Sequence, residues 1–110
     1  MIIVRIAMNA LSEKQKELMQ TLLSMIEFTG KEKGCLSHHV FRDIEDQKVF
    51  NRIDEWETRE DLNDHIKSDR FSILLGTKSL LYEPPQIEIH TVCHSEGMET
   101  IDALRSKRVQ

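Results

Sequence analysis

His65 is the side chain in this sequence best suited to proton transfer near neutral pH. It lies between Leu62 and Ile66 in a stretch whose apolar spacing predicts a helix with these three residues on one face. Because that face should pack against a sheet, we expect His65 to point toward any cavity there. An unperturbed imidazole has a pKa of about 6.5, which suits a general base. The alternative is a half-buried histidine that hydrogen-bonds to the backbone or to Asp69.

Asn9, Trp56 and Arg5 are further candidates for binding or catalysis. Asn9 ends the first predicted strand, where its amide could donate a hydrogen bond to a developing oxyanion, although asparagine is also common where strands end. Trp56 ends the third predicted strand and could stack on a flat aromatic substrate or pack in the core. Arg5 lies in an apolar strand, where it could hold an anionic group or pair with Glu55 or Asp54.

The other histidines do not have the spacing of a metal-ligand set. His38 and His39 are neighbours in a predicted strand and point to opposite faces. His90 and His94 share a face, but at about 3.3 Å per residue they lie roughly 13 Å apart. We therefore expect no metal site.

The elements that would position these residues follow the order βαββαβ. Apolar spacing predicts four strands and three helical segments, over residues 2–7, 35–44, 48–56 and 86–94 for the strands, and 12–30, 58–66 and 68–81 for the helices. Ser12 and Gln15 have the spacing of a capping box, and Thr58 and Ser68 are expected N-caps. This order is typical of an α+β, ferredoxin-like split βαβ fold with helices on one face of a four-stranded antiparallel sheet.

The ends of this pattern suggest a domain and an extension. We expect a domain over residues 1–94, followed by a C-terminal helical extension over 95–110 whose stripe of Met98, Ile101 and Leu104 docks on its own or a partner subunit. The first and third strands are apolar on both faces, whereas the fold's own helices cover only one. We therefore expect a second copy to stack on the open face, which makes the chain a homodimer.

Length and charge exclude several classes of protein. The 110 residues fit one domain, and the net charge of −4 argues against nucleic-acid binding. No apolar run is long enough to span a bilayer, and the start MIIVRIAMN lacks the pattern of a signal peptide, so we expect a cytoplasmic protein with no membrane partner. Cys35 and Cys93 belong to no CxxC pair and are expected to be free thiols.

Three segments resemble the antibiotic biosynthesis monooxygenase (ABM) family. They are DEWETREDLNDHIKSDRF over residues 54–71, LLYEPPQI over 80–87 and GCL over 34–36, and the resemblance covers about residues 1–94. It implies a dimeric α+β barrel. It also implies a range of activities: some members are cofactor-free oxygenases of aromatic polyketides or quinols, others degrade haem, and others act on small sugar-like signalling molecules.

The haem-degrading branch of that family fits this sequence poorly. That branch has a tryptophan where this sequence has His65, and an axial histidine where it has Leu75, while Asn9 matches. The resemblance therefore implies no haem, and we expect no other cofactor.

The leading hypothesis is a cofactor-independent monooxygenase that acts on a small phenolic or quinol-type substrate with dioxygen. His65 would take or guide the substrate proton, and Asn9 would hydrogen-bond the oxygen that gains charge. Trp56, Phe41 and Phe71 would wall an apolar pocket, and Arg5 would hold an anionic group. Two alternatives remain open, which are a non-catalytic dimeric module that binds a small ligand and an isomerase-type enzyme on the same fold.

Overall fold

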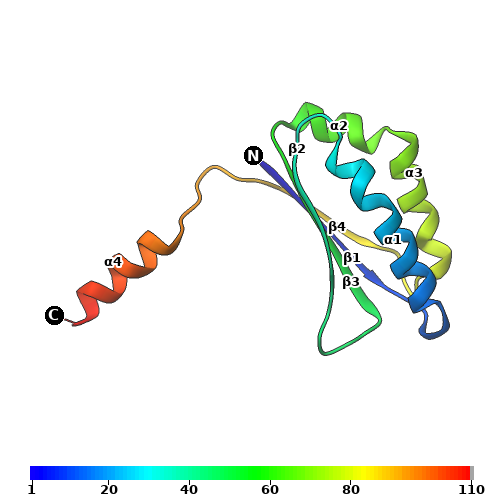
Figure 1. The fold of residues 1–110 in the computed structure, drawn as a ribbon, viewed down its shortest axis with the longest axis horizontal. Helices are drawn as coiled ribbons and strands as arrows, with labels where there is room; N and C mark the ends of the chain where they lie inside the picture. Colours follow the sequence, from blue (N-terminus) through cyan, green and yellow to red (C-terminus); the bar gives the residue numbers. More distant parts are fainter. Residues whose placement is uncertain (110) are drawn as a thin grey trace.

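The computed structural model describes residues 1–109, and it is built around one antiparallel sheet with helices on one face (Figure 1). The sheet has the strand order β2-β3-β1-β4. Its strands are β1 (Ile2–Asn9), β2 (Cys35–Arg42), β3 (Val49–Trp56) and β4 (Gln86–Thr91). The helices on its covered face are α1 (Gln15–Gly30), α2 (Arg59–Ile66) and α3 (Asp69–Gly76). This arrangement confirms the predicted α+β, ferredoxin-like fold.

Strand parity divides the sheet into a face that the helices cover and an open face. On the covered face, β1 and β3 contribute alternate buried side chains, which are Ile2, Val4, Ile6, Met8, Phe50, Arg52, Asp54 and Trp56. Register pairs Ile2 with Trp56 at one end and Asn9 with Val49 at the other. The residues between them are half-buried or exposed on the open face, which no element of the described chain covers.

α1 packs on the sheet through one stripe of side chains but starts differently from the prediction. Leu18, Leu22 and Met25 are buried at helical spacing. The helix begins at Gln15, after a short 3₁₀ turn (η1, Ser12–Lys14), and not at Ser12. The predicted capping box is wrong, because the Gln15 side-chain amide donates to the Ser12 carbonyl oxygen at 3.1 Å and no side chain caps the helix.

The caps predicted for the next two helices are confirmed. Thr58 Oγ1 accepts from the Asp61 N–H at 3.1 Å, and Ser68 Oγ accepts from the Phe71 N–H at 3.2 Å. The helix expected over residues 68–81 is shorter, since α3 ends at Gly76 and continues as a 3₁₀ turn (η2, Thr77–Leu80).

The C-terminal part leaves the sheet earlier than predicted. β4 ends at Thr91 and not at residue 94, because its pairing partner β1 begins at Ile2 and the last contact is from the Val92 N–H to the Met1 carbonyl oxygen. The chain then extends to α4 (Met98–Val109), which lies on the opposite side of the sheet from α1, α2 and α3 (Figure 1). Among the described residues, no helix is long and apolar enough to cross a membrane.

The Thr58 cap offers a direct test of how α2 is held. Thr58→Ala removes the acceptor for the Asp61 N–H and should lower the free energy of unfolding by about 0.5–2 kcal/mol. Thr58→Ser keeps the oxygen and should retain most of that stability. Urea denaturation of both variants measures the difference, and equal losses in the two would contradict the cap assignment.

Candidate active site

His65 lies at the centre of a buried polar cluster between the helices and the sheet. Its imidazole stacks on the Trp56 indole, with ring centroids 4.7 Å apart, and meets the Phe71 ring edge-on at 5.3 Å. Its Nδ1 lies 2.5 Å from Glu32 Oε2, and its Nε2 lies 2.7 Å from Arg52 Nη2. Neither the backbone nor Asp69 is the partner of the ring, in contrast to the alternative drawn from the sequence.

These partners determine the tautomer of His65. A guanidinium can only donate, so Arg52 Nη2 donates to Nε2, which must carry a lone pair. The proton therefore resides on Nδ1, which donates to the Glu32 carboxylate. This is the tautomer in which a carboxylate orients the ring and leaves Nε2 as the basic atom.

Arg52 is held in turn by Asp54 on the same strand. Residues at i and i+2 of a strand share a face, and the guanidinium donates to Asp54 through Nε at 3.2 Å and Nη2 at 2.9 Å. His38, opposite Asp54 on β2, donates from Nδ1 to Asp54 Oδ1 at 2.5 Å. The cluster thus runs from Glu32 through His65, Arg52 and Asp54 to His38.

Burial and charge set the protonation of this cluster. Burial lowers the pKa of His65 below its ordinary value, the charge of Arg52 lowers it further, and the opposing effect of the Glu32 carboxylate is smaller. Burial opposes ionisation of Asp54, but the hydrogen bond from His38 and the charge of Arg52 outweigh it and lower its pKa. His65 is therefore neutral at pH 7, and Asp54 is ionised.

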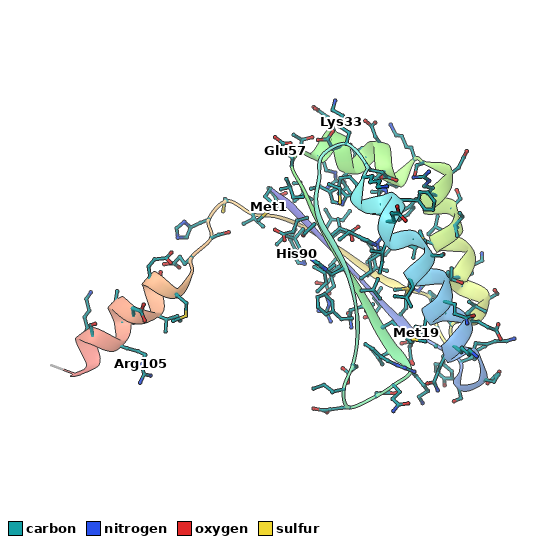
Figure 2. The ribbon with its side chains drawn as sticks, in the orientation of Figure 1. Met1, Met19, Lys33, Glu57, His90 and Arg105 are labelled. Atoms are coloured by element: carbon teal, nitrogen blue, oxygen red, sulfur yellow. The ribbon has the colours of Figure 1, made fainter. Side chains whose placement is uncertain are left out.

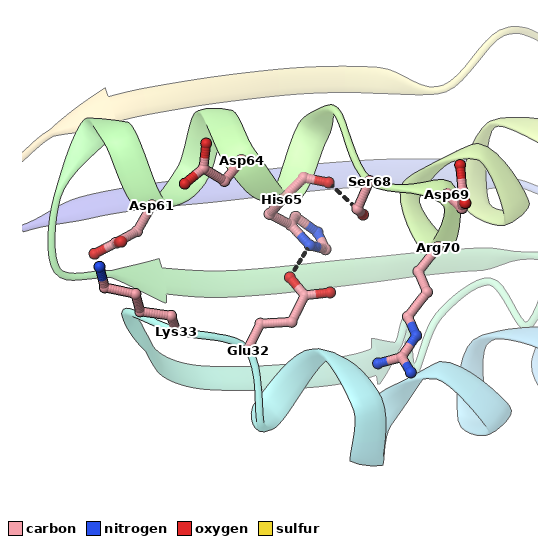
Figure 3. Close-up of a pocket in the computed structure, with 8 residues that line it drawn as sticks. All are labelled: Glu32, Lys33, Asp61, Asp64, His65, Ser68, Asp69 and Arg70. Carbon is pink, nitrogen blue, oxygen red and sulfur yellow. Dashed lines mark hydrogen bonds and ion pairs between the residues drawn. The ribbon is translucent and has the colours of Figure 1, made fainter.

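A pocket of about 410 Å³ opens to solvent beside His65 (Figure 3). The residues that line it are of polar or charged types and come from the turn after α1, from α2 and from the start of α3; they are Glu32, Lys33, Asp61, Asp64, His65, Ser68, Asp69 and Arg70. The Glu32 side chain is 20% exposed and that of His65 only 1%. Glu32 is thus the member of the pair that meets solvent.

Two of the predicted substrate-binding aromatic residues lie with His65. Trp56 and Phe71 are both buried, at 0% and 6% exposure, and both contact the imidazole. The Trp56 ring packs on His65 itself, so the surface that it was expected to offer to a substrate is occupied by the imidazole. Trp56 Nε1 and Arg52 Nη1 are buried donors with no partner among the described residues.

Asn9 is separated from this cluster by the length of a strand. Trp56 is paired with Ile2 and Asn9 with Val49, so the whole length of β1, roughly 23 Å at 3.3 Å per residue, separates the two ends. Asn9 and His65 of one chain therefore do not face a common small substrate, and the predicted pairing of their roles is wrong for a single chain.

Phe41 and Arg5 lie on the open face. Phe41 is 51% exposed and has the opposite strand parity from His38, so the expectation that it walls one pocket with Trp56 and Phe71 is wrong. Arg5 pairs with neither Glu55 nor Asp54. Its Nε donates to Asn51 Oδ1 at 3.2 Å and its Nη1 lies 3.9 Å from Glu88 Oε1, because Glu88 stands opposite Arg5 in the register of β4.

Two members of the cluster, Glu32 and Arg52, were not singled out from the sequence, and Asp54 was named only as a possible partner of Arg5. A detectable signal existed for Arg52 and Asp54, which alternate with Phe50 and Trp56 on one strand face, where two opposite charges indicate a buried pair. Glu32 follows α1 in a turn, and nothing in its sequence neighbourhood connects it with a histidine 33 positions later.

The two cysteines are free thiols, as predicted. Cys35 is half-buried, and burial, followed by the negative charges of Asp54 and Glu32, raises its pKa to about 11. A thiol that stays protonated at neutral pH is a poor nucleophile, so Cys35 is not a candidate for covalent chemistry.

Comparison with protein families gives one match. A family model described as "Antibiotic biosynthesis monooxygenase" matches residues 1–72, which include Glu32, His38, Arg52, Asp54 and His65. No curated protein sequence matches the chain.

Solved structures share the fold over most of the chain. A conserved protein from Methanosarcina mazei Go1 is 31% identical, with a TM-score of 0.77, and the match covers 81% of this chain and 89% of that one. Rv0793 from Mycobacterium tuberculosis is 18% identical, with a TM-score of 0.80 and coverage of 87% and 98%. A candidate antibiotic biosynthesis monooxygenase from Deinococcus radiodurans is 20% identical, with a TM-score of 0.82 and coverage of 88% and 97%. Because the last two structures are only 18% and 20% identical to this chain in sequence, they show that the fold is shared and nothing more.

Arg52 should be far more important for stability than Arg5. Arg52→Met leaves Asp54 as an uncompensated buried charge and should lower the free energy of unfolding by about 3–5 kcal/mol. Arg5→Met removes an exposed pair on the open face and should change it by less than about 1 kcal/mol. Thermal and urea unfolding of the two variants provide the measurement, and similar losses would contradict the role assigned to the buried pair.

Stability should fall as the pH decreases through the range in which histidine titrates. The pKa of His65 is lower in the folded state, so below pH ~6.5 the unfolded chain binds a proton that the folded chain does not. The stability that the neutral His65 contributes to the folded state is complete above pH ~6.5. It is lost below that pH, and the free energy of unfolding falls by up to about 1.4 kcal/mol per pH unit. The lowered pKa of Asp54 acts in the same direction, but only below pH ~4.

The measurement is urea unfolding at several pH values between 5 and 7.5. His65→Gln should flatten the slope in this window, whereas His39→Gln, at an exposed position of β2, should leave it unchanged. A slope that is the same in wild type and His65→Gln would show that His65 is not the group responsible.

Proposed function

Because the chain belongs to the antibiotic biosynthesis monooxygenase family, we propose that it is a cofactor-independent monooxygenase of a small phenolic or quinol-type substrate. The observation that carries the proposal is the neutral His65, whose Nδ1–H is held by Glu32 beside a pocket of about 410 Å³. A carboxylate-oriented imidazole whose Nε2 carries a lone pair is suited to removing a proton at neutral pH once a substrate hydroxyl replaces Arg52 as its partner.

The contact between His65 and Arg52 suggests where a substrate hydroxyl would bind. Nε2 accepts from Arg52 Nη2 at 2.7 Å in the ligand-free chain. A phenolic hydroxyl inserted between these groups would donate to Nε2 and accept from the guanidinium. Proton transfer would then place the imidazolium next to the Glu32 carboxylate and the phenolate next to Arg52, so each new charge would meet an opposite one. Arg52 thereby takes the role that the sequence had suggested for Asn9.

The remaining chemistry belongs to the deprotonated substrate. A phenolate gives an electron to dioxygen, the two radicals combine to a peroxide on a ring carbon, and loss of water leaves a carbonyl there. One oxygen atom enters the product and the other leaves as water, so the substrate supplies all the electrons. Trp56 and Phe71 pack on the His65 imidazole and would exclude bulk water from the base and from the charge that it acquires.

Oxygen uptake with a panel of hydroquinones and anthrones tests the proposal. His65→Gln keeps a hydrogen-bonding side chain of similar size but cannot act as the base, and should lower kcat by about a hundredfold or more. His39→Gln is the matched control and should keep wild-type turnover. Full turnover in His65→Gln would refute the role of His65, and no oxygen uptake by the wild type with any member would count against the activity itself.

One observation favours a second candidate, a module that binds a small ligand without converting it. In the ligand-free chain the basic lone pair of His65 is already engaged by Arg52, and Asp54 holds Arg52 in place. If this contact persists, the pocket can bind but not deprotonate a ligand. That function predicts a higher Tm in the presence of the phenol, without oxygen consumption and without product.

A further inference from the structure

α4 is a helix that no other part of the described chain covers. Every described side chain of α4 is exposed except that of Thr100, which is half-buried. Figure 2 shows the helix, with Arg105 labelled, projecting away from the body. The radius of gyration is 16.9 Å, whereas a compact chain of this length has about 13 Å. The helix therefore extends the molecule and adds nothing to its core.

A helix of this length needs a packing partner. α4 has 12 residues, and isolated helices shorter than about 12–15 residues are marginal in water. Met98, Ile101 and Leu104 are 65%, 48% and 62% exposed. They recur every third residue and lie within a sector of the helix about 120° wide, in which Arg105 stands between Met98 and Ile101. Burial of these three side chains against a partner, with the Arg105 guanidinium reaching to solvent, would stabilise the helix.

A matching surface lies on the covered face of β4. Ile87 and Ile89 are paired with Ile6 and Val4, which are buried, yet they are 43% and 37% exposed themselves. α1, α2 and α3 thus leave this edge of the sheet partly uncovered. The lengths also agree, since α4 is about 18 Å long at 1.5 Å per residue and β4 about 20 Å at 3.3 Å per residue.

The direction of the arm points to another copy and not to the same chain. α4 lies on the open-face side of its own sheet, whereas its own Ile87 and Ile89 face the other side (Figure 1). On the open face, Phe41 is 51% exposed. The arm and the open face therefore lie on the same side of the molecule, and neither has a partner within the described chain. A two-fold dimer can bury both, because its interface is self-complementary.

The connection is long enough to reach. The six residues from 92 to 97 span up to about 20 Å when extended. The arm has to cross two distances. It must pass from its own sheet to the sheet of the other copy, about 10 Å, and then beyond that sheet to the layer that its helices occupy, which is about 10 Å thick. An arm that leaves the edge of one sheet can therefore reach the covered face of a copy stacked on the open face.

We propose that α4 is an exchanged arm, which packs through Met98, Ile101 and Leu104 on the covered face of β4 in a second copy of this chain. Ile87 and Ile89 of that copy receive the stripe, and each copy gives its arm to the other. This interface is separate from the His65 pocket, so its outcome is independent of the proposed activity.

The test compares two double variants of the full chain by equilibrium sedimentation. Ile101→Ser with Leu104→Ser removes the stripe and should raise the dimer Kd by at least about a hundredfold, because two apolar side chains per copy lose their burial. Asp102→Ser with Lys107→Ser changes two positions away from the stripe with no change in net charge, and should leave the Kd within about threefold of wild type. Equal Kd values for the two variants would overturn the proposal.

A second measurement follows the arm in the wild-type chain, and one further pair of variants locates the receiving surface. Amide hydrogen exchange in the wild type should show α4 protected at concentrations where the chain is dimeric, and unprotected on dilution to monomer. Ile89→Ser should weaken the dimer, and the control Ile73→Ser, at a 54% exposed isoleucine of α3, should not. Protection of α4 in a monomer would show that the arm folds back on its own chain, and an unprotected α4 in the dimer would exclude arm exchange.

Discussion

The buried ion pair between Arg52 and Asp54 is the constraint on which the interior of this protein depends. Both side chains are about 1% exposed, in a layer otherwise filled by residues such as Phe50 and Leu62. Two charges in such a layer are tolerated only when each has a partner of good geometry. Two hydrogen bonds join the pair, at 3.2 and 2.9 Å, and the two histidines of the cluster bond to its ends.

This arrangement links stability to the chemistry that the pocket could perform. Asp54 holds Arg52, and Arg52 keeps His65 in the tautomer with a basic Nε2. Burial lowers the pKa of His65, and the charge of Arg52 lowers it further. Glu32 completes the pair from the solvent side, because it is the partly exposed member. The same contacts therefore keep the charged groups satisfied when the pocket is empty and place a base, a cation and a carboxylate where a phenolic proton could be transferred.

The two faces of the sheet have different roles. The covered face encloses the polar cluster and the apolar core, and it is complete within one chain except at the edge strand β4. The open face carries two of the four residues that the sequence had assigned to substrate binding, Arg5 and Phe41, which are on the other side of the sheet from His65 in a single chain. α4 projects on that same side. In the two proposals made above, the pocket within each chain performs the chemistry, and the open face and the arm serve association.

The sequence by itself determined the elements and their order, because strand alternation, helical spacing and local caps such as Thr58 and Ser68 depend on neighbours a few positions apart. It also placed His65 on the buried face of its helix, together with Leu62. Tertiary structure alone decided the partners of His65, since Glu32 is 33 positions away and Arg52 lies on a different element. It also separated Asn9 and Phe41 from His65, because strand length and strand parity, and not residue type, determine which side chains meet.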